Sequence, residues 1–376
     1  MNHKNVSGLI LSSAITLSAV SGLNVTAEDS LDIESLRDFL IGEKNIMISV
    51  SYDLNNDNKY NVFDFIILKH DLSNTEKNTI YVQNAAELQS ALNNAQAGDE
   101  IILKSGNYTP AETGPKGANF WSSADGTAEN PITIKSEDPN KPALLFGQNI
   151  ENGVVLYITG DYWNIENLSV QNAQKGIILD NSNYSEISGC NVSETASEGI
   201  HLRDNSSYCT VKGCTVTNTG RKSPGYGEAI YVGSSESTQD YGHYCNNNVI
   251  SDCVLGPGVT AELVDIKEYT DGTIVENCIM YGDDISGATS ANAFLKTKGN
   301  NSIIRNNTAY QNGNTIIRNA FEVHEIVSEW GYNNEFLGNI CYLDNDSAYL
   351  VRVYSGSASA LGDIRIPEGN LYEGTN

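Results

Sequence analysis

A short motif recurs seven times between residues 163 and 340, and it constrains the fold more than any other feature of the chain. Most copies pair apolar or β-branched residues with a following Gly or Asn and then a small or apolar residue. The copies occupy residues 163–168, 186–190, 210–214, 249–253, 274–278, 303–307 and 335–340. Such a strand cannot bury its own apolar face but can stack on its neighbours, so the repeat predicts a solenoid.

The spacing of the copies narrows the architecture. Aligned on Ile165, Ile187, Val211, Ile250, Val275, Ile304 and Leu337, they lie 22 to 39 residues apart, and the long steps predict longer loops on one side. A β-propeller would need four strands in each blade of ~40 residues, and the apolar runs are too few for that. Residues 81–106 read as strand, helix and strand, which is typical of an opening cap. We therefore predict an all-β parallel β-helix over residues 79–376.

Four of the seven cysteines share one position of the repeat: Cys190, Cys214, Cys253 and Cys278. This register predicts an inward ladder of buried thiols, because no CxxC spacing accompanies it and thiols behave as small apolar groups. A Cys209–Cys245 disulfide between neighbouring coils is an alternative that the sequence leaves open.

The first 27 residues have the pattern of a secretory signal peptide. His3 and Lys4 give a basic start, residues 8–20 are apolar, and Val25-Thr26-Ala27 forms a cleavage site of small residues. A membrane anchor is the alternative, but the apolar run falls short of the ~20 residues that span a bilayer. We expect a secreted, extracellular protein, monomeric and without a membrane span.

The net charge of the chain narrows the classes of molecule that it can bind. The chain has 47 acidic and 22 basic side chains, a net charge of −25, which argues against nucleic acid and anionic membranes. It does not exclude an acidic substrate, because a cleft can be locally basic on an acidic protein.

Residues 53–64 have the spacing of an EF-hand loop, which binds Ca²⁺ through side-chain oxygens and one carbonyl. The loop departs from the usual pattern at Asn58, where Gly is common. The alternative interpretation of residues 53–64 is a polar turn whose oxygen-bearing side chains match the EF-hand spacing by chance. The expected ligands are Asp53, Asn55, Asp57, the Lys59 carbonyl, Asn61 and Asp64.

The helix predicted at residues 65–72 has an echo 32 residues upstream, in which Asp32 corresponds to Asp64 and Leu36 to Leu68. This duplicated loop and helix, over residues 28–73 with a linker at 74–78, resembles a dockerin, the module that binds cohesins of cellulosomal scaffoldins. The resemblance implies a small α-helical EF-hand module and a cohesin partner. It also implies a single calcium site, because the first loop would fall inside the signal peptide.

A second series of strands, between the copies of the motif, contains the candidate catalytic and binding residues. Its inward apolar pairs include Ile177/Leu179, Val264/Ile266 and Phe321/Val323, so the residues between and after such pairs point outward together. The first outward column reads Ile178, His201, Tyr231, Asp265, Lys296, Glu322 and Arg352. The second reads Asp180, Arg203, Gly233, Lys267, Lys298, His324 and Tyr354. Cations thus cluster on one face of an acidic chain.

This face predicts β-elimination on a uronic-acid polymer, in which a base removes the proton next to the carboxylate and a cation stabilises the developing charge. Lysines among other cations have lowered pKa values, which makes Lys267 or Lys298 a candidate base. His324 and Arg352 are candidates to bind substrate or donate a proton. The expected substrate-binding residues are His201, Arg203, Tyr231, Lys296 and Trp330.

Three carboxylates are candidates for a catalytic Ca²⁺ that bridges to the substrate: Asp265, Glu268 and Glu322. The insertion at residues 219–244, rich in Gly, Ser and Tyr, is predicted to form one wall of a groove.

Several segments resemble parts of pectate-lyase-like right-handed β-helix proteins: residues 131–136, 261–268, 296–299 and 321–325 with Trp330-Gly331. The resemblance covers residues 79–376 and implies a right-handed coil. It also implies a Lys or Arg base near carboxylate-bound Ca²⁺ and an acidic plant or microbial polysaccharide, such as a pectin-like polymer, as substrate. The superfamily contains lyases, hydrolases, epimerases and adhesins, so fold alone does not decide activity.

Two other functions stay open. A glycoside hydrolase of plant cell-wall polysaccharide would need carboxylates flanking the bond; Asp265 and Glu322 are candidates, with lysines between them. A noncatalytic carbohydrate-binding or adhesion protein would use the alternating charges only to solubilise the sheet through pairs across strands.

Overall fold

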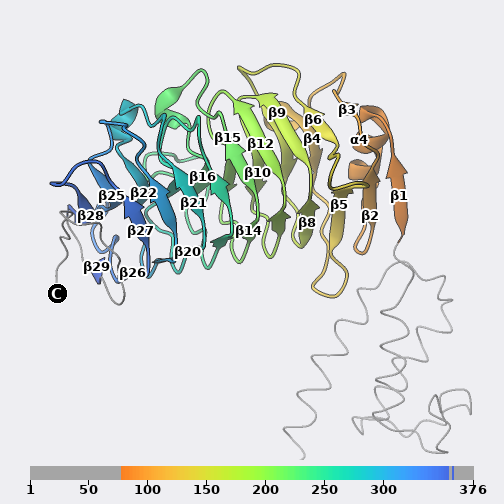
Figure 1. Cartoon of the computed structure of the whole chain (residues 1–376). Coiled ribbons are helices and arrows are strands. Elements are labelled where there is room, and N and C mark those ends of the chain that lie inside the picture. The colour runs from red at the N-terminus through yellow and green to blue at the C-terminus, as the bar shows by residue number, and fades with distance from the viewer. Residues whose placement is uncertain (1–77, 355–357, 360–376) are drawn as a thin grey trace, which may run out of the picture. The chain divides into compact units, whose positions relative to one another are not determined.

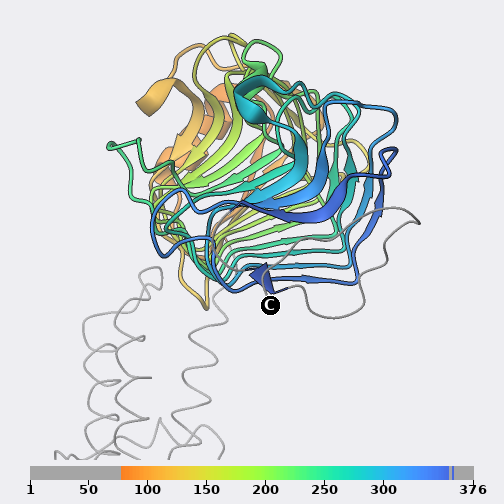
Figure 2. The same ribbon diagram turned by 90° about the vertical axis from the view of Figure 1, so that its left-hand side faces the viewer.

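Three parallel β-sheets wind around one apolar core in the part of the chain that the computed structural model describes, residues 78–354 and 358–359 (Figure 1). Most coils contribute one strand to each sheet, so strands far apart in sequence pair side by side. Figure 2 shows the coils end-on, with the strands of each sheet stacked behind one another. The predicted all-β parallel β-helix is confirmed.

Some predictions fall on residues 1–77, which lie outside the described residues. These are the signal peptide, the dockerin-like module and the calcium loop from Asp53 to Asp64. They stay predictions.

Sheet A has eleven strands: β1 (Thr79–Val82), β2 (Glu100–Leu103), β5 (Ile132–Ser136), β8 (Trp163–Glu166), β11 (Glu186–Ser188), β14 (Thr210–Lys212), β17 (Val249–Ser251), β20 (Ile274–Glu276), β23 (Ile303–Arg305), β26 (Asn334–Leu337) and β29 (Ala358–Ser359). Sheet B has nine: β3 (Asn107–Tyr108), β6 (Leu144–Phe146), β9 (Ser169–Ala173), β12 (Asn191–Thr195), β15 (Thr215–Thr217), β18 (Val254–Leu255), β21 (Ile279–Tyr281), β24 (Thr308–Tyr310) and β27 (Ile340–Tyr342).

Sheet C also has nine strands and carries the second strand series: β4 (Ala118–Ser122), β7 (Val154–Ile158), β10 (Lys175–Asp180), β13 (Ile200–Arg203), β16 (Ile230–Val232), β19 (Val264–Ile266), β22 (Ala293–Thr297), β25 (Asn319–Val323) and β28 (Tyr349–Val353).

The recurring motif lies on the strands of sheet A, as the sequence predicts, with Ile165 opposite Ile187 and Ile187 opposite Val211. One alignment was wrong. Ile304 pairs with Phe336, one residue earlier than Leu337. Because strand side chains alternate, this register turns the Phe336 ring into the core, where it is fully buried, and leaves Leu337 partly exposed.

Helix α4 (Ala85–Asn94) packs against β1, β2 and β4. It begins at Asn84, whose side chain accepts a hydrogen bond from the Glu87 backbone N–H at 3.0 Å, and it buries Leu88 and Leu92. Short 3₁₀ turns interrupt the loops: η2 (Pro115–Gly117), η3 (Pro224–Tyr226) and η4 (Ala288–Ser290). Within the described ranges, no helix is long and apolar enough to cross a membrane.

All seven cysteines are buried and unpaired, which confirms the interpretation as buried thiols. In the ladder, each thiol donates to the carbonyl two residues earlier, as Cys190 does to Ser188 at 3.5 Å. The alternative Cys209–Cys245 bridge is absent from the structure. The Cys209 thiol instead donates to the Ser182 carbonyl at 3.0 Å, and burial raises its pKa to about 12.

Candidate active site on the outer face of sheet C

The outward columns of sheet C form as the sequence predicts. In the first column, β-pairing places Tyr231 opposite Asp265, Asp265 opposite Lys296, and Lys296 opposite Glu322, with Arg352 next. The period of two along each strand therefore brings these side chains onto one face.

The second column follows from backbone hydrogen bonds just beyond the paired segments. The N–H of Lys267 donates to the Val232 carbonyl at 2.9 Å, and that of Lys298 donates to Ile266 at 2.8 Å. His324 and Tyr354 continue the series on β25 and β28. The outer face thus carries two parallel rows of charged side chains.

Asp265 is the centre of this face. Its carboxylate, almost fully buried, accepts from Lys267 Nζ at 2.9 Å through Oδ2 and from Lys298 Nζ through Oδ1. The two lysines lower the pKa of Asp265 far below its usual range despite the opposing effect of burial. One ionised aspartate therefore holds two lysine side chains in fixed positions.

The two lysines differ in their proton affinity. Burial alone would lower the pKa of Lys267, but Asp265 and Tyr231 outweigh it and raise that pKa well above the ordinary lysine value. Burial lowers the pKa of Lys298; Asp265 opposes this, and Lys267 lowers the pKa further, so the pKa stays below the ordinary value. The predicted lowering of a lysine pKa is found at Lys298 and not at Lys267.

Tyr231 and Lys267 are the two members of this centre that solvent reaches most easily. Lys267 Nζ lies 4.9 Å from the Tyr231 ring centroid, and both side chains are partly exposed. His201 packs edge-on against the Tyr231 ring at 4.4 Å between centroids. Burial raises the pKa of Tyr231, with Lys267 acting against it, so the phenol keeps its proton at neutral pH.

His201 is buried and neutral. Its Nε2 lies 2.8 Å from the Gly233 carbonyl, which can only accept, so Nε2 carries the proton. Its Nδ1 has no hydrogen-bond partner and lies 3.7 Å from Glu198 Oε1. Burial lowers the pKa of His201 well below its usual value, and the cations Lys175 and Arg203 lower it further.

A third outward row was missed by the sequence analysis. Glu198, Glu228 and Glu262 each lie two residues before a strand of sheet C begins, ahead of β13, β16 and β19 respectively. Strict alternation places a residue two positions before an inward residue on the inward side, so the rule that predicted the other rows could not find these carboxylates. Glu198 binds Lys175 at 2.5 Å and Glu262 binds Lys296 at 3.0 Å.

Glu228 lies within this row without a cation. Its Oε2 has no hydrogen-bond partner in the described part of the chain. Burial raises its pKa well above the usual carboxylate range, and Glu198, Asp265 and Glu262 raise it further. The protonated form of Glu228 is therefore favoured more strongly than that of an exposed carboxyl group.

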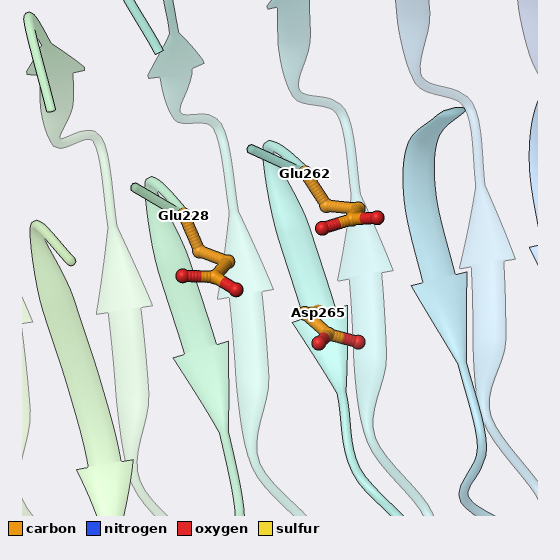
Figure 3. Close-up of side chains that lie close together, drawn as sticks. All are labelled: Glu228, Glu262 and Asp265. Carbon is orange, nitrogen blue, oxygen red and sulfur yellow. The ribbon is translucent and has the colours of Figure 1, made fainter. Parts of the chain in front are cut away.

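Glu228, Glu262 and Asp265 form an acidic triad, with one oxygen of each within 4.8 Å of the others (Figure 3). Carboxylates of this kind could hold a metal ion. However, Lys267 and Lys298 occupy both oxygens of Asp265, and Lys296 binds Glu262. A Ca²⁺ here would face three ammonium groups and would need six to eight oxygens, so the triad as arranged does not fit a resident Ca²⁺.

The other two predicted calcium ligands lie elsewhere. Glu268 accepts from the backbone N–H of Glu236 at 2.6 Å. Glu322 binds Lys296 at 3.4 Å and His324 Nε2 at 2.9 Å. Burial opposes the ionised form of Glu322, yet these partners and Asn319 lower its pKa to about 2. Of the three predicted ligands, only Asp265 belongs to the acidic triad.

The C-terminal end of the face is open and aromatic. His324 stacks on Tyr354 with ring centroids 4.3 Å apart and is partly exposed. The Arg352 guanidinium lies 4.5 Å from the Tyr349 ring and 5.8 Å from the Tyr354 ring. Both His324 and Arg352 can therefore contact a ligand bound along this face.

Two of the predicted substrate-binding residues are engaged within the protein. Arg203 forms a bidentate ion pair with Asp180, with both bonds at 2.7 Å, and both side chains are buried. Trp330 lies in the loop after β25, where its ring contacts Tyr269 at 5.5 Å between centroids. Asp180 therefore uses most of the donors of Arg203, and Trp330 packs against Tyr269.

The three-sheet coil and the lysine-rich face on sheet C place the chain among the parallel β-helix polysaccharide lyases. A family model described as Pel9A-like, right-handed β-helix region matches residues 67–334, and the chain belongs to this family. An alginate lyase from Paenibacillus sp. str. FPU-7 has a similar structure, with a TM-score of 0.75 and 44% identity over 79% of this chain and 98% of that one. The enzyme is thus a polysaccharide lyase.

A rhamnogalacturonan lyase also matches, with a TM-score of 0.51 and 16% identity over 72% of this chain and 74% of that one, which shows the shared fold. Among curated proteins, no match was found.

Proposed function

We propose that this enzyme cleaves a uronic-acid polysaccharide, specifically alginate, by β-elimination. The observation that carries the substrate is the 44% identity to an alginate lyase, which extends over 98% of that protein. The pectin-like substrate suggested by sequence is the second candidate, and its support is the family match.

The reaction has a fixed set of requirements. A base takes the proton from the carbon next to the uronate carboxylate, and that electron pair forms a C=C bond as the bond to the glycosidic oxygen breaks. The leaving oxygen takes up a proton, and no water is consumed. The site must therefore supply a cation for the carboxylate, a proton acceptor and a proton donor.

Lys267 is suited to the first task. Its raised pKa keeps it an ammonium ion at neutral pH, and its side chain is partly exposed beside Tyr231. Asp265 fixes its position before substrate arrives, so little reorganisation is needed when charge develops. Lysine in this arrangement supplies the positive charge that a Ca²⁺ supplies in the sequence-based prediction.

Lys298 and Tyr231 are suited to the proton transfers. Lys298 has the lowered pKa that a base requires, and Asp265 holds it beside Lys267. Tyr231 keeps its phenolic proton and faces Lys267, so it can donate that proton to the leaving oxygen. Arg352 and His324, on the open end of the face, bind further uronate groups.

The test compares two substrates, each incubated with the full-length protein. Incubation with alginate should give unsaturated products, detected by their ultraviolet absorbance, while polygalacturonate should give few or none. Lys267→Met should remove the activity, and the exposed Lys212→Met on sheet A should keep it. Cleavage of polygalacturonate but not alginate would overturn the substrate assignment, and reducing ends without unsaturated products would indicate hydrolysis.

We further propose that the protein is secreted and attaches to a cellulosome or cell surface through its N-terminal module. The support is the signal-peptide pattern of residues 1–27 and the calcium-loop spacing of residues 53–64. Pull-down with scaffoldin cohesins, with Asp57→Ala as the matched variant, tests this. Retention that is equal for both proteins, or absent for both, would contradict it.

A further inference from the structure

A loop crosses one end of the outer face of sheet C. It comprises residues 234–244, between β16 and β17, and is called the strap below. Three hydrogen bonds tie the strap to the turn after β13. Gly242 N–H donates to Asp204 at 2.6 Å, Tyr244 N–H donates to Asn205 at 3.1 Å, and Ser207 donates to the Tyr244 carbonyl at 3.1 Å.

Tyr241 is the residue of the strap that covers the outer face of sheet C. Its ring lies 3.7 Å from the Arg203 guanidinium carbon on one side, and Lys116 Nζ of η2 lies 5.0 Å from its centroid. Lys116 precedes β4, four strands towards the N-terminus from β16 in sheet C. The strap and the loop that contains η2 therefore meet above strands β7, β10 and β13.

The polar groups beneath Tyr241 are already paired. Asp180 takes both bonds from Arg203 and a third, at 2.8 Å, from the Tyr157 hydroxyl. Further towards the N-terminus, Trp121 lies against Gly114, where a Cβ would overlap the indole ring. Asp180 uses the Arg203 guanidinium at this end, and Lys116 lies against the Tyr241 ring, so both of these cations already contact other groups of the protein.

Exposure divides the face at β16. Tyr157 and Ile178 point outward from sheet C, yet they are only 7% and 1% exposed and belong to an apolar cluster with Ala118 and Val154. Beyond β16, Asp265, Lys296, Lys298 and Glu322 are also buried, but Lys267, His324 and Arg352 are partly exposed and Tyr354 is 51% exposed. The face is covered on the N-terminal side of Tyr231, and on the C-terminal side solvent reaches it at these four residues.

We propose that the substrate groove is one-sided: the strap closes it next to the reacting centre, and the polymer extends only along β19, β22, β25 and β28. This inference rests on the proposed function. Coils are spaced by about 4.8 Å, so β13 alone leaves room for about one sugar before Tyr241. The enzyme therefore removes short unsaturated fragments of fixed length from one end of the chain.

The experiment follows alginate that carries a label at its reducing end. With the wild-type full chain, short products should accumulate while viscosity falls slowly, and the label should leave either with the first products or only with the last. Random loss of the label with a rapid fall in viscosity would overturn the inference while leaving the lyase function intact. Absence of any unsaturated product would instead remove the proposed function and the inference with it.

The strap is tested by Tyr241→Ala. Opening the covered end should lengthen the products and raise the loss of viscosity per unsaturated end several-fold. Tyr342→Ala, on sheet B and 51% exposed, is the matched control and should behave as the wild type. Lys116→Ala, which keeps the Tyr241–Arg203 contact, should give a smaller shift in the same direction. Unchanged product sizes in a folded Tyr241→Ala protein would contradict the role of the strap.

Discussion

Lys267 donates to Asp265 at 2.9 Å, and the two side chains project from the same outer face two positions apart along the chain. This contact decides the protonation of the lysine. Asp265 is buried and ionised. If Lys267 lost its proton, the Asp265 carboxylate would lose one of its two ammonium partners while staying shielded from water, which is unfavourable. Lys267 is therefore a permanent cation at the centre of the site.

Replacement of Lys267 tests this role. Lys267→Met should lower kcat by about 10²–10⁴-fold, because the charge that develops on the uronate loses its cation. Lys267→Arg keeps the charge and the Asp265 partner, and should retain more activity than Lys267→Met. Circular dichroism must show both variants folded. Equal activity of Lys267→Met and wild type would exclude the role.

The pH dependence of activity tests Lys298. As a base it must be neutral, so activity should rise with pH until Lys298 has lost its proton. Its lowered pKa places this rise below the ordinary lysine value of about 10.4. In Lys298→Met, kcat should fall and the alkaline rise should disappear. A profile in Lys298→Met with the same rise would assign the base to another group.

Chelation tests the neutralisation by lysine. Because lysines occupy Asp265 and Glu262, activity on alginate should be unchanged after EDTA treatment and dialysis. The measurement should use a protein that lacks residues 1–77 beside the full chain, so that an effect of Ca²⁺ on the predicted loop at residues 53–64 is separated from an effect on the β-helix. Loss of activity in both proteins, restored by added Ca²⁺, would show that a metal ion takes part.

Much of the outer face could be predicted from sequence because strand side chains alternate. The rows from Asp265 to Arg352 needed only the correct inward pairs, such as Val264/Ile266, and a constant register between coils. Glu228 does not follow from this rule, because it precedes β16 and has the same parity as the inward Ile230. The register failed only at Phe336, where two apolar residues stand next to each other and the larger one takes the core.

The chemistry of individual groups could not be predicted in the same way. Lys267 and Lys298 stand in equivalent positions of neighbouring coils, yet their pKa values move in opposite directions. Lys298 is more deeply buried and Lys267 lowers its pKa further, whereas Asp265 and Tyr231 raise the pKa of Lys267. The position of Tyr241 over Arg203 depends on how the strap folds back, and no periodic pattern in residues 234–244 encodes it.

The buried His201 makes the stability of the fold depend on pH. It is held neutral in the folded protein, since burial and the cations Lys175, Arg203 and Lys267 all oppose its protonation. Of its other neighbours, Glu198 lies 3.7 Å from Nδ1 and the Tyr231 ring packs against it. In the unfolded chain the histidine gains a proton below about pH 6.5. The unfolded state then binds more protons, so the free energy of unfolding falls as pH falls through this range.

His201→Gln isolates this effect, because glutamine can still donate to the Gly233 carbonyl but does not titrate. Between pH 6.5 and 5, the wild-type free energy of unfolding should fall relative to the variant by up to about 1.4 kcal/mol per pH unit. Urea unfolding at several pH values measures it. Contributions from Glu228 and Glu322 are common to both proteins and cancel in the difference. Parallel pH profiles for the two proteins would show that His201 binds its proton equally well in the folded and unfolded states.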